Sequence, residues 1–379
     1  MEDWKENQYE EDDIQIENAE ELNDLTYTTP NEGYVFKEVH VTKKDFSVFE
    51  LARKYKKGDL ILDVSFERKL VWKERQKCEL IESILMGLPL PIFYFKQLEN
   101  GKFVVVDGKQ RLSTLFEFLD DKFALKNLKI LDFLNKKKFS DLINEFGIYQ
   151  TQLEDYQVYS HVILPPTPDR ILFDIFDRVN RGGTKLNKQE IRNALYQGNG
   201  MDMIHNITKG ETFERVTRIQ NKKDSRMKGA YLLTRYFAFY LYINRYLWNG
   251  GEPYKYNGDM DEFIEVTLKY LNKCSDEELL RLWSLTDYAL NNAYFYLERA
   301  AFRKRENSPI NMNLFETTLI VMSRVKFKDN DIREDIAEKI RNVIDSEEFN
   351  SYIGNGRDSV QNVIGRFNMM LKIAEEYKL

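Results

Sequence analysis

The segment KFVVVDGKQRLSTLFEF (102–118) gathers three groups that could do chemistry, Asp107, Gln110 and Arg111, around a single glycine, Gly108. The apolar run before Asp107 predicts a buried strand, the Asp-Gly pair predicts a turn, and large apolar residues then recur at helical spacing. Arg111 therefore falls in the first turn of a helix, where free N–H groups favour an anion over a cation. A phosphate between Arg111 and those N–H groups would interact favourably with both, and would therefore explain an arginine at this position.

A second interpretation of this turn needs no ligand. Asp107 could cap the helix while Gln110, three residues later, completes a capping box. That arrangement leaves Arg111 unexplained. The residues alone leave both interpretations open.

A similar arrangement follows later in the chain, in FDRVNRGGTKL (176–186). There, as at Asp107–Arg111, glycines give the backbone conformational freedom, and arginines lie at a helix boundary. Together with Arg68, the two segments would offer several guanidinium groups and two glycine turns to one anionic ligand. Each signal is weak alone, and their combination predicts a phosphate site.

Length and composition predict a globular protein with a large core. The chain has 379 residues, of which 42% are hydrophobic and 13% aromatic, enough for two domains. No apolar run approaches the roughly 18 residues of a membrane span, and the acidic start does not resemble a signal peptide. We therefore expect a cytoplasmic protein without a membrane segment, whose Cys78 and Cys274 are core thiols.

Charge is unevenly distributed along the chain. The net charge is −6, from 56 basic and 62 acidic residues, but residues 1–24 hold 11 of the acidic residues and one lysine. Subtraction leaves 55 basic and 51 acidic residues, a charge of +4 for the rest. The acidic segment predicts a disordered tail, with a regulatory or DNA-mimicking arm as the alternative. The mildly basic body permits contact with nucleic acid or nucleotide phosphates.

Hydrophobic periodicity changes at about residue 203. Before it, short strands alternate with helices, and after it one helix follows another. We expect an α+β fold with a tail over 1–32, a mixed α/β domain over 33–202 and a helical domain over 203–379. The predicted strands are 60–64, 92–97, 102–106 and 156–164. The predicted helix starts include 45, 110, 167 and the capping box Asn187–Glu190, and a further helix is expected after Trp72.

The order of four motifs carries a family resemblance. They are FER…W (66–72), IESILMGLPLP (81–91), DGKQR (107–111) and F…NRGGTKL…EIR (176–192). Over about residues 40–200 the chain resembles the GmrSD-type restriction-enzyme N-terminal domain family, also labelled domain of unknown function two-six-two. The family implies a ParB/sulfiredoxin-like core in the α/β domain. The helical region resembles the family more loosely, ending at GNGRDS (354–359) and Arg366.

The resemblance implies a nucleotide-dependent defence protein whose Asp-Gly-Gln-Gln-Arg motif binds and hydrolyses nucleoside triphosphates with Mg²⁺. In this chain Lys109 replaces the first glutamine of that motif. The added lysine could strengthen phosphate binding, and the absent glutamine could impair hydrolysis. The implied catalytic residues are Asp107, Gln110 and Arg111, with Asp107 also a candidate magnesium ligand. The implied nucleotide-binding residues are Arg68, Gly108, Lys109, Asn180, Arg181, Gly182, Gly183 and Thr184.

Family members that cut DNA commonly carry a C-terminal His-Asn-His-type nuclease. This chain has three histidines, His40, His161 and His205, in unrelated contexts, and His161 is expected to be structural. Because paired histidines are what would hold a metal and activate water, we expect any nuclease to be a partner protein. No cysteine lies in the Asp107–Arg111 loop, so sulfiredoxin chemistry is not expected.

The leading hypothesis is a nucleotide-binding, NTP-hydrolysing component of an anti-phage or modification-dependent restriction system. One alternative is a DNA-binding sensor or nickase that uses the same arginines, and a catalytically inactive adaptor is another. DNA binding is suggested by the basic run Arg215, Arg218, Lys222, Lys223, Arg226 and Lys228, although such a run is commonly a solvated helix face.

Overall fold

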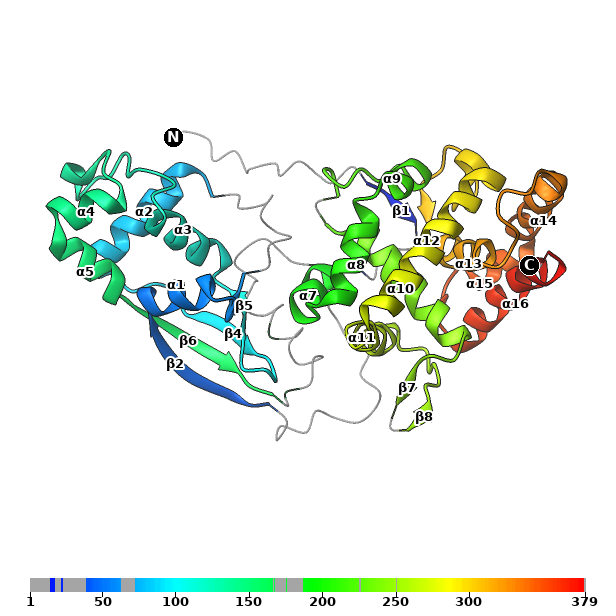
Figure 1. Cartoon of the computed structure of the whole chain (residues 1–379), viewed down its shortest axis with the longest axis horizontal. Coiled ribbons are helices and arrows are strands. Elements are labelled where there is room, and N and C mark those ends of the chain that lie inside the picture. The colour runs from blue at the N-terminus through cyan, green and yellow to red at the C-terminus, as the bar shows by residue number, and fades with distance from the viewer. Residues whose placement is uncertain are drawn as a thin grey trace. The chain divides into compact units, whose positions relative to one another are not determined.

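The computed structural model describes residues 14–17, 22, 39–62, 72–165, 167, 175, 187–224, 226–249 and 251–377. They divide between two compact units, which Figure 1 shows: an α/β unit (Thr29–Leu186) and a helical unit (Met1–Thr28 with Asn187–Leu379). The division lies before α7 (Lys188–Leu195) and not after residue 202, because this helix belongs with the helices that follow it. The expected capping box is confirmed: Asn187 Oδ1 accepts from Glu190 N, and Glu190 Oε2 accepts from Asn187 N.

A five-stranded mixed sheet forms the α/β unit, in the order β2-β6-β4-β5-β3. Antiparallel pairs join β2 to β6 and β4 to β5, whereas β6 runs parallel to β4 and β3 runs parallel to β5. The mixed sheet and the helical second unit confirm the α+β class. The strands are β2 (Val41–Ser47), β3 (Leu60–Ile61), β4 (Phe93–Gln97), β5 (Phe103–Asp107) and β6 (Gln157–Ile163).

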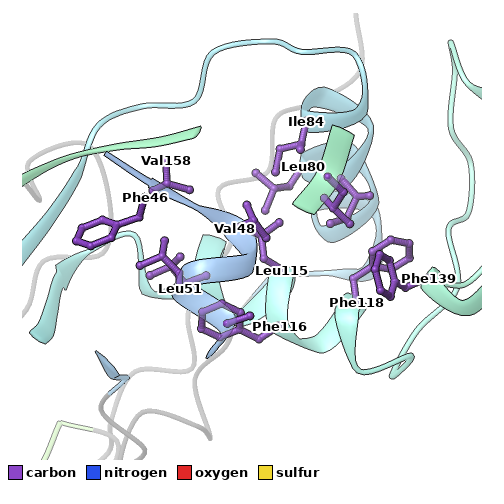
Figure 2. Close-up of a cluster of buried hydrophobic side chains, with 14 of the residues drawn as sticks. Phe46, Val48, Leu51, Leu80, Ile84, Leu115, Phe116, Phe118, Phe139 and Val158 are labelled. Carbon is purple, nitrogen blue, oxygen red and sulfur yellow. The ribbon is translucent and has the colours of Figure 1, made fainter. Parts of the chain in front are cut away.

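Helices pack on one face of this sheet and enclose an aromatic core. Alternate strand residues such as Phe46, Phe95 and Val158 point into that core, because successive strand side chains face opposite sides. Figure 2 shows helix residues such as Leu115 and Phe118 in the same cluster. The helices are α1 (Val48–Lys56), α2 (Glu74–Leu85), α3 (Lys109–Leu119), α4 (Phe139–Glu145) and α5 (Gly147–Asp155), with a 3₁₀ turn η4 (Asp132–Leu134).

The edge strand β2 is a feature that the sequence analysis did not predict. A helix was expected from Asp45, but the helix begins at Val48 because Ser47 Oγ caps it by accepting from Glu50 N at 3.1 Å. Residues 41–47 instead pair with β6 along their whole length. Most of β2 is exposed and polar, so it lacks the apolar alternation that marks a half-buried strand.

The helical unit is built around α13 (Met312–Met322), every residue of which is buried. The aromatic-rich α10 (Lys228–Ile243) and the long α12 (Asp276–Leu297) lie against it. The aromatic residues Tyr231, Tyr236, Phe237 and Phe239 of α10 are buried in this core. The other helices are α8 (Asn199–Thr208), α9 (Glu211–Thr217), α11 (Met260–Leu271), α14 (Arg333–Asp345), α15 (Glu347–Tyr352) and α16 (Val360–Glu376), with 3₁₀ turns η6 (Glu298–Ala300) and η7 (Asn330–Ile332) and a hairpin of β7 (Trp248–Asn249) and β8 (Glu252–Pro253).

Part of the acidic N-terminal segment is a strand of the helical unit. β1 (Ile16–Glu17) pairs in parallel with β9 (Ile310–Asn311). Glu17 forms an ion pair with Lys304 at 2.7 Å, and the Lys228 ammonium donates to the carbonyl of Ile14. Leu22 is 1% exposed. These residues differ from the disordered tail expected from composition, because their backbone and side chains contact the rest of the helical unit.

Both cysteines, Cys78 and Cys274, are free thiols. Among the described residues, no helix is both long enough and apolar enough to cross a membrane.

Candidate functional site

The turn between β5 and α3 accepts only glycine at its centre. Gly108 is the N-cap of α3 and has a φ of 101°, in the region that L side chains rarely adopt. A Cβ added there would lie 2.2 Å from Cδ1 of the buried Phe93 ring. The backbone therefore passes directly over Phe93, and this approach fixes where the helix begins.

The capping box considered for this turn is wrong. Gly108, not Asp107, is the N-cap, and no side chain makes a cap hydrogen bond. The first turn of α3 therefore lacks the side-chain acceptor that usually satisfies its N–H groups. Such a helix start is suited to an anion.

Arg111 lies in the first turn of α3, as expected, but its guanidinium is held by the protein itself. NH2 donates to Asp107 Oδ2 at 2.8 Å and to the carbonyl of Ile92 at 3.3 Å, and NH1 donates to the carbonyl of Pro91. The group also stacks 3.9 Å from the centre of the Phe93 ring. Burial lowers the pKa of Arg111 below its ordinary value, and the Asp107 carboxylate opposes that shift.

A tyrosine holds the other part of the same loop. The Tyr156 hydroxyl donates to Leu88 O at 2.8 Å and accepts from Leu90 N at 3.0 Å. The segment GLPLP (87–91), which ends α2, is therefore fixed by Tyr156 at one point and by Arg111 at another. Leu88 remains 47% exposed. Arg111 thus positions this loop beside the start of α3.

A β-bulge sets the position of Asp107. Tyr94 pairs with Asp107, whereas the next residue of β4, Phe95, pairs with Val105, so Val106 is the extra residue of β5. Bulges re-aim side chains and are common beside active sites. Here the bulge brings the carboxylate of Asp107 to the end of the strand, next to Arg111, with 29% of its side chain exposed.

Asp107 can contribute to a magnesium site without forming one alone. Mg²⁺ is commonly bound by one or two carboxylates together with substrate phosphates. Asp107 uses Oδ2 for Arg111, and its partial exposure leaves the carboxylate within reach of a ligand. In the described part of the chain, no group of three or more His, Cys, Asp and Glu side chains could hold a metal ion by itself.

The other predicted nucleotide-binding residues divide into two sets. Gly108, Lys109 and Gln110 lie in the turn and first turn just described. Arg68, Asn180, Arg181, Gly182, Gly183 and Thr184 lie outside the described residues.

The basic run in the helical unit does not present all its charges together. Arg226 forms an ion pair with Glu190 at 3.1 Å, Lys228 contacts the N-terminal segment, and Arg215 NH2 donates to Asn291 at 3.0 Å. The exposed members that remain are Arg218, Lys222 and Lys223, at and after the end of α9.

A second arginine lies beside Arg218. Arg303 is buried and donates to the carbonyls of Ala301 and Thr217 at 2.9 and 2.6 Å. Burial, with the nearby charge of Arg218, lowers the pKa of Arg303 to about 10. This spot therefore concentrates positive charge.

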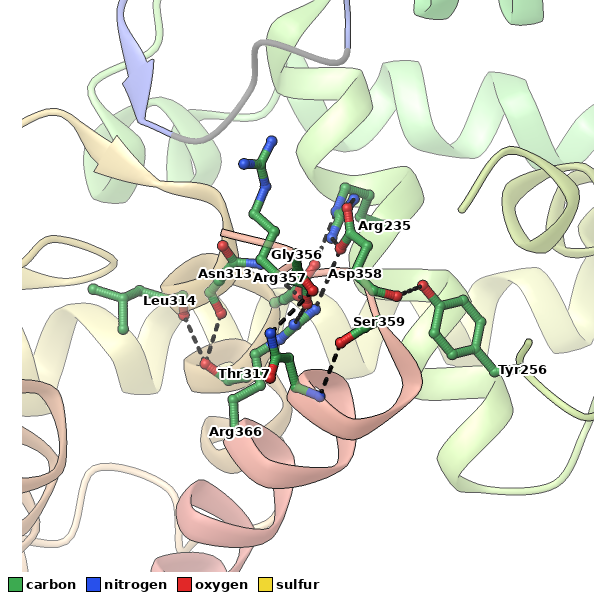
Figure 3. Close-up of polar contacts among 12 residues, drawn as sticks. Arg235, Tyr256, Asn313, Leu314, Thr317, Gly356, Arg357, Asp358, Ser359 and Arg366 are labelled. Carbon is green, nitrogen blue, oxygen red and sulfur yellow. Dashed lines mark hydrogen bonds and ion pairs between the residues drawn. The ribbon is translucent and has the colours of Figure 1, made fainter. Parts of the chain in front are cut away.

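Sequence analysis missed a buried ionic network in the helical unit. Figure 3 shows Asp358, from the loop between α15 and α16, beside Arg235 and Arg366. Arg235 pairs with Glu316 at 2.9 Å and with Asp358 at 2.8 Å, and Arg366 pairs with Glu316 at 2.6 Å. Arg235, Glu316 and Arg366 are fully buried. The sequence analysis had singled out the GNGRDS segment (354–359) and Arg366, without their partners.

The network holds that loop to three helices. Arg366 also donates to the carbonyl of Arg357, and the Tyr256 hydroxyl donates to the carbonyl of Asp358 at 2.6 Å. Burial opposes ionisation of Asp358, but Arg235 and Arg366 outweigh it and lower its pKa to about 2. The network places the buried Glu316 and the partly exposed Asp358 against two buried guanidiniums, so it is a structural element of the helical core.

Comparison with known proteins points to the α/β unit. Residues 48–197 match the family model described as GmrSD restriction endonuclease, N-terminal domain. No curated protein and no solved structure matches the chain. The matched range contains the Gly108 turn and the GLPLP loop, and it ends before the basic run and the buried network.

Proposed function

We propose that this chain, whose residues 48–197 match the GmrSD restriction endonuclease N-terminal domain, is a component of a restriction or anti-phage system, and that it binds and hydrolyses nucleoside triphosphates in the cytoplasm. The observation that carries this proposal is the turn at Gly108. It joins an uncapped helix start, a carboxylate and an arginine in one place. The ParB/sulfiredoxin-like core of the α/β unit is part of the proposal.

Each residue of the turn has a proposed role. The N–H groups at the start of α3, which no side chain caps, bind phosphate oxygens. Asp107 holds Mg²⁺ or orients the attacking water, and Gln110 positions that water. Arg111 holds the GLPLP loop and keeps a positive charge beside the phosphates. The family resemblance adds Arg68 and the 180–184 segment as further phosphate and ligand contacts.

Phosphate release tests the proposal. ATP, GTP and CTP are each supplied with Mg²⁺, with and without DNA, to the wild type, Asp107→Asn and Arg111→Ala. The control is Glu79→Gln, which breaks a comparable ion pair of residues four apart, Arg75–Glu79, on the exposed face of α2. We expect hydrolysis that both turn variants lose and the control retains.

Two other results would change the conclusion. Binding of nucleotide without release in the wild type would support the inactive adaptor, with Lys109 as the departure that impairs hydrolysis. Absence of both binding and release would overturn nucleotide binding altogether. Folding of each variant is checked by hydrogen exchange of α3 and β5, so that a misfolded variant is not counted.

DNA binding by the helical unit is a second candidate function. The observation that favours it is the exposed group of Arg218, Lys222 and Lys223 at and after the end of α9, whose charges a polyanion would neutralise. Replacing Lys222 or Lys223 with alanine should weaken DNA binding and reduce the slope of log K against log salt by about one each. Arg281→Ala, an exposed arginine on α12, is the control. A DNA affinity independent of salt would contradict this function. DNA cleavage is assigned to a partner protein.

A further inference from the structure

A row of side chains crosses the face of the sheet opposite the aromatic core and ends at Asp107. Asp107 pairs with Tyr94, Tyr94 with His161, and His161 with Lys43, each on the next strand. Paired residues on neighbouring strands lie on the same face. With strands about 4.8 Å apart, the row extends roughly 14 Å from Asp107 to Lys43.

Aromatic rings occupy the middle of this row. The rings of Tyr94 and His161 meet edge to face, with centroids 5.4 Å apart. The exposed Tyr159 lies two residues before His161 on the same face of β6. Neither the Tyr94 hydroxyl nor the His161 ring makes a hydrogen bond to another described residue. The helices of the aromatic core lie on the opposite face, with Phe93 and Phe95.

This face carries charges of both signs, which favours the binding of an aromatic base over the binding of a polyanion. Lys43 stands at one end of the row and Asp107 at the other, Asp45 is the partner of Tyr159, and Lys96 lies two residues after Tyr94 on the same face. Positive partial charge also lies at the start of α3, next to Asp107. The face therefore offers ring surfaces and hydrogen-bonding groups beside a phosphate site.

We propose that Tyr94 and His161 form the platform for the nucleobase of a nucleoside triphosphate whose phosphates lie at the start of α3. This inference rests on the proposed function and adds the residues that would recognise the base. The rings supply stacking surface, and the His161 nitrogens, the Tyr94 hydroxyl and the Lys43 ammonium are the groups that can distinguish one base from another. Asp107 links the platform to the phosphate end.

NMR of the histidine rings tests this directly, because the chain has three histidines. Replacing each with glutamine assigns the three C2–H signals. ATP, GTP, CTP and inorganic tripolyphosphate are then titrated separately, and calorimetry measures their binding. We expect at least one nucleotide to shift the His161 signal through the ring current of its base, whereas tripolyphosphate binds without shifting it. His205, which contacts Asn193 in the helical unit, is the control.

The outcomes separate this inference from the proposed function. A nucleotide that binds without moving the His161 signal overturns the platform and leaves nucleotide binding intact. An equal shift with tripolyphosphate also overturns it, since phosphate would then be the group near His161. If no nucleotide binds, both proposals are overturned.

A substitution gives an independent measurement. Tyr94→Ala should weaken nucleotide binding about ten-fold, as expected for loss of one stacked base, and leave tripolyphosphate binding unchanged. Phe49→Ala, which removes an exposed aromatic ring from α1, should affect neither. Equal weakening of nucleotide and tripolyphosphate by Tyr94→Ala would contradict the platform.

Discussion

The Gly108 turn and the buried network of the helical unit use the same groups in different surroundings. In each, an arginine pairs with a carboxylate and donates to loop carbonyls: Arg111 to Asp107 and Pro91, Arg366 to Glu316 and Arg357. The Arg366 side chain is 0% exposed and the Arg111 side chain 12%. In the network, two guanidiniums enclose Glu316 completely, whereas Asp107 keeps an exposed surface. Burial therefore makes one arrangement structural and leaves the other open to a ligand.

Breaking the buried network should have the largest effect. Glu316→Ala leaves two guanidiniums without their shared carboxylate, which should cost about 3–5 kcal/mol of stability because the buried charges remain. Chemical denaturation with peptide-resolved hydrogen exchange would show the loss in the helical unit. Glu277→Ala, which removes an exposed partner of Arg281 on α12, should change little. Equal losses in the two variants would contradict the structural role.

A substitution of Gly108 should have the next largest effect on stability. Gly108→Ala adds both positive-φ strain and a clash with Phe93, together roughly 2–4 kcal/mol. Gly101→Ala is a matched control, because Gly101 has a φ of 81° and nothing within 4 Å of the added Cβ. It should show the backbone strain alone. If both variants lose the same stability, the close approach to Phe93 contributes nothing.

Acid should weaken the network through Asp358. Its folded pKa of about 2 lies below the ordinary value of 3.8, so the stabilisation is present above about pH 4 and is lost as the pH falls towards 2. The shift corresponds to roughly 2 kcal/mol. Denaturation of the helical unit between pH 5 and pH 2.5 should show a steeper loss for the wild type than for Asp358→Asn. Parallel curves would show that Asp358 does not contribute.

The smallest predicted effect concerns the loop that Arg111 holds. Tyr156→Phe removes the hydroxyl that bonds Leu88 O and Leu90 N, at a cost of about 1 kcal/mol. Hydrogen exchange should become faster over residues 87–91. Tyr149→Phe, on α5 of the same unit, is the comparison. Unchanged exchange in Tyr156→Phe would show that Arg111 alone holds the loop.

Local patterns in the sequence predicted much of the α/β unit. The strand–turn–helix at residues 102–119 was predicted because an apolar run, a glycine and helical spacing agree. The polar edge strand β2 was missed, because its pairing with β6 leaves no apolar alternation. The α+β class followed from the change of periodicity near residue 203.

The site was predicted in its position but not in its contacts. Sequence spacing placed Arg111 at the helix start, but the carbonyls of Pro91 and Ile92 come from 20 and 19 residues earlier. No local pattern encodes such a contact. The same limit applies to Arg235, Glu316 and Asp358, whose pairing depends on long-range packing. The row from Asp107 to Lys43 depends on strand order, which the sequence analysis did not predict.

The pairing of β1 with β9 has a consequence for the order of folding. Ile16 and Ile310 are joined across nearly 300 residues of chain, so the ribosome makes one strand long before the other. The described strands of the α/β unit, by contrast, all lie between Val41 and Ile163. Contacts between distant segments form slowly, and domains generally fold as units during synthesis. The α/β unit can therefore complete its sheet before β9, the strand that pairs with Ile16 and Glu17, has been synthesised.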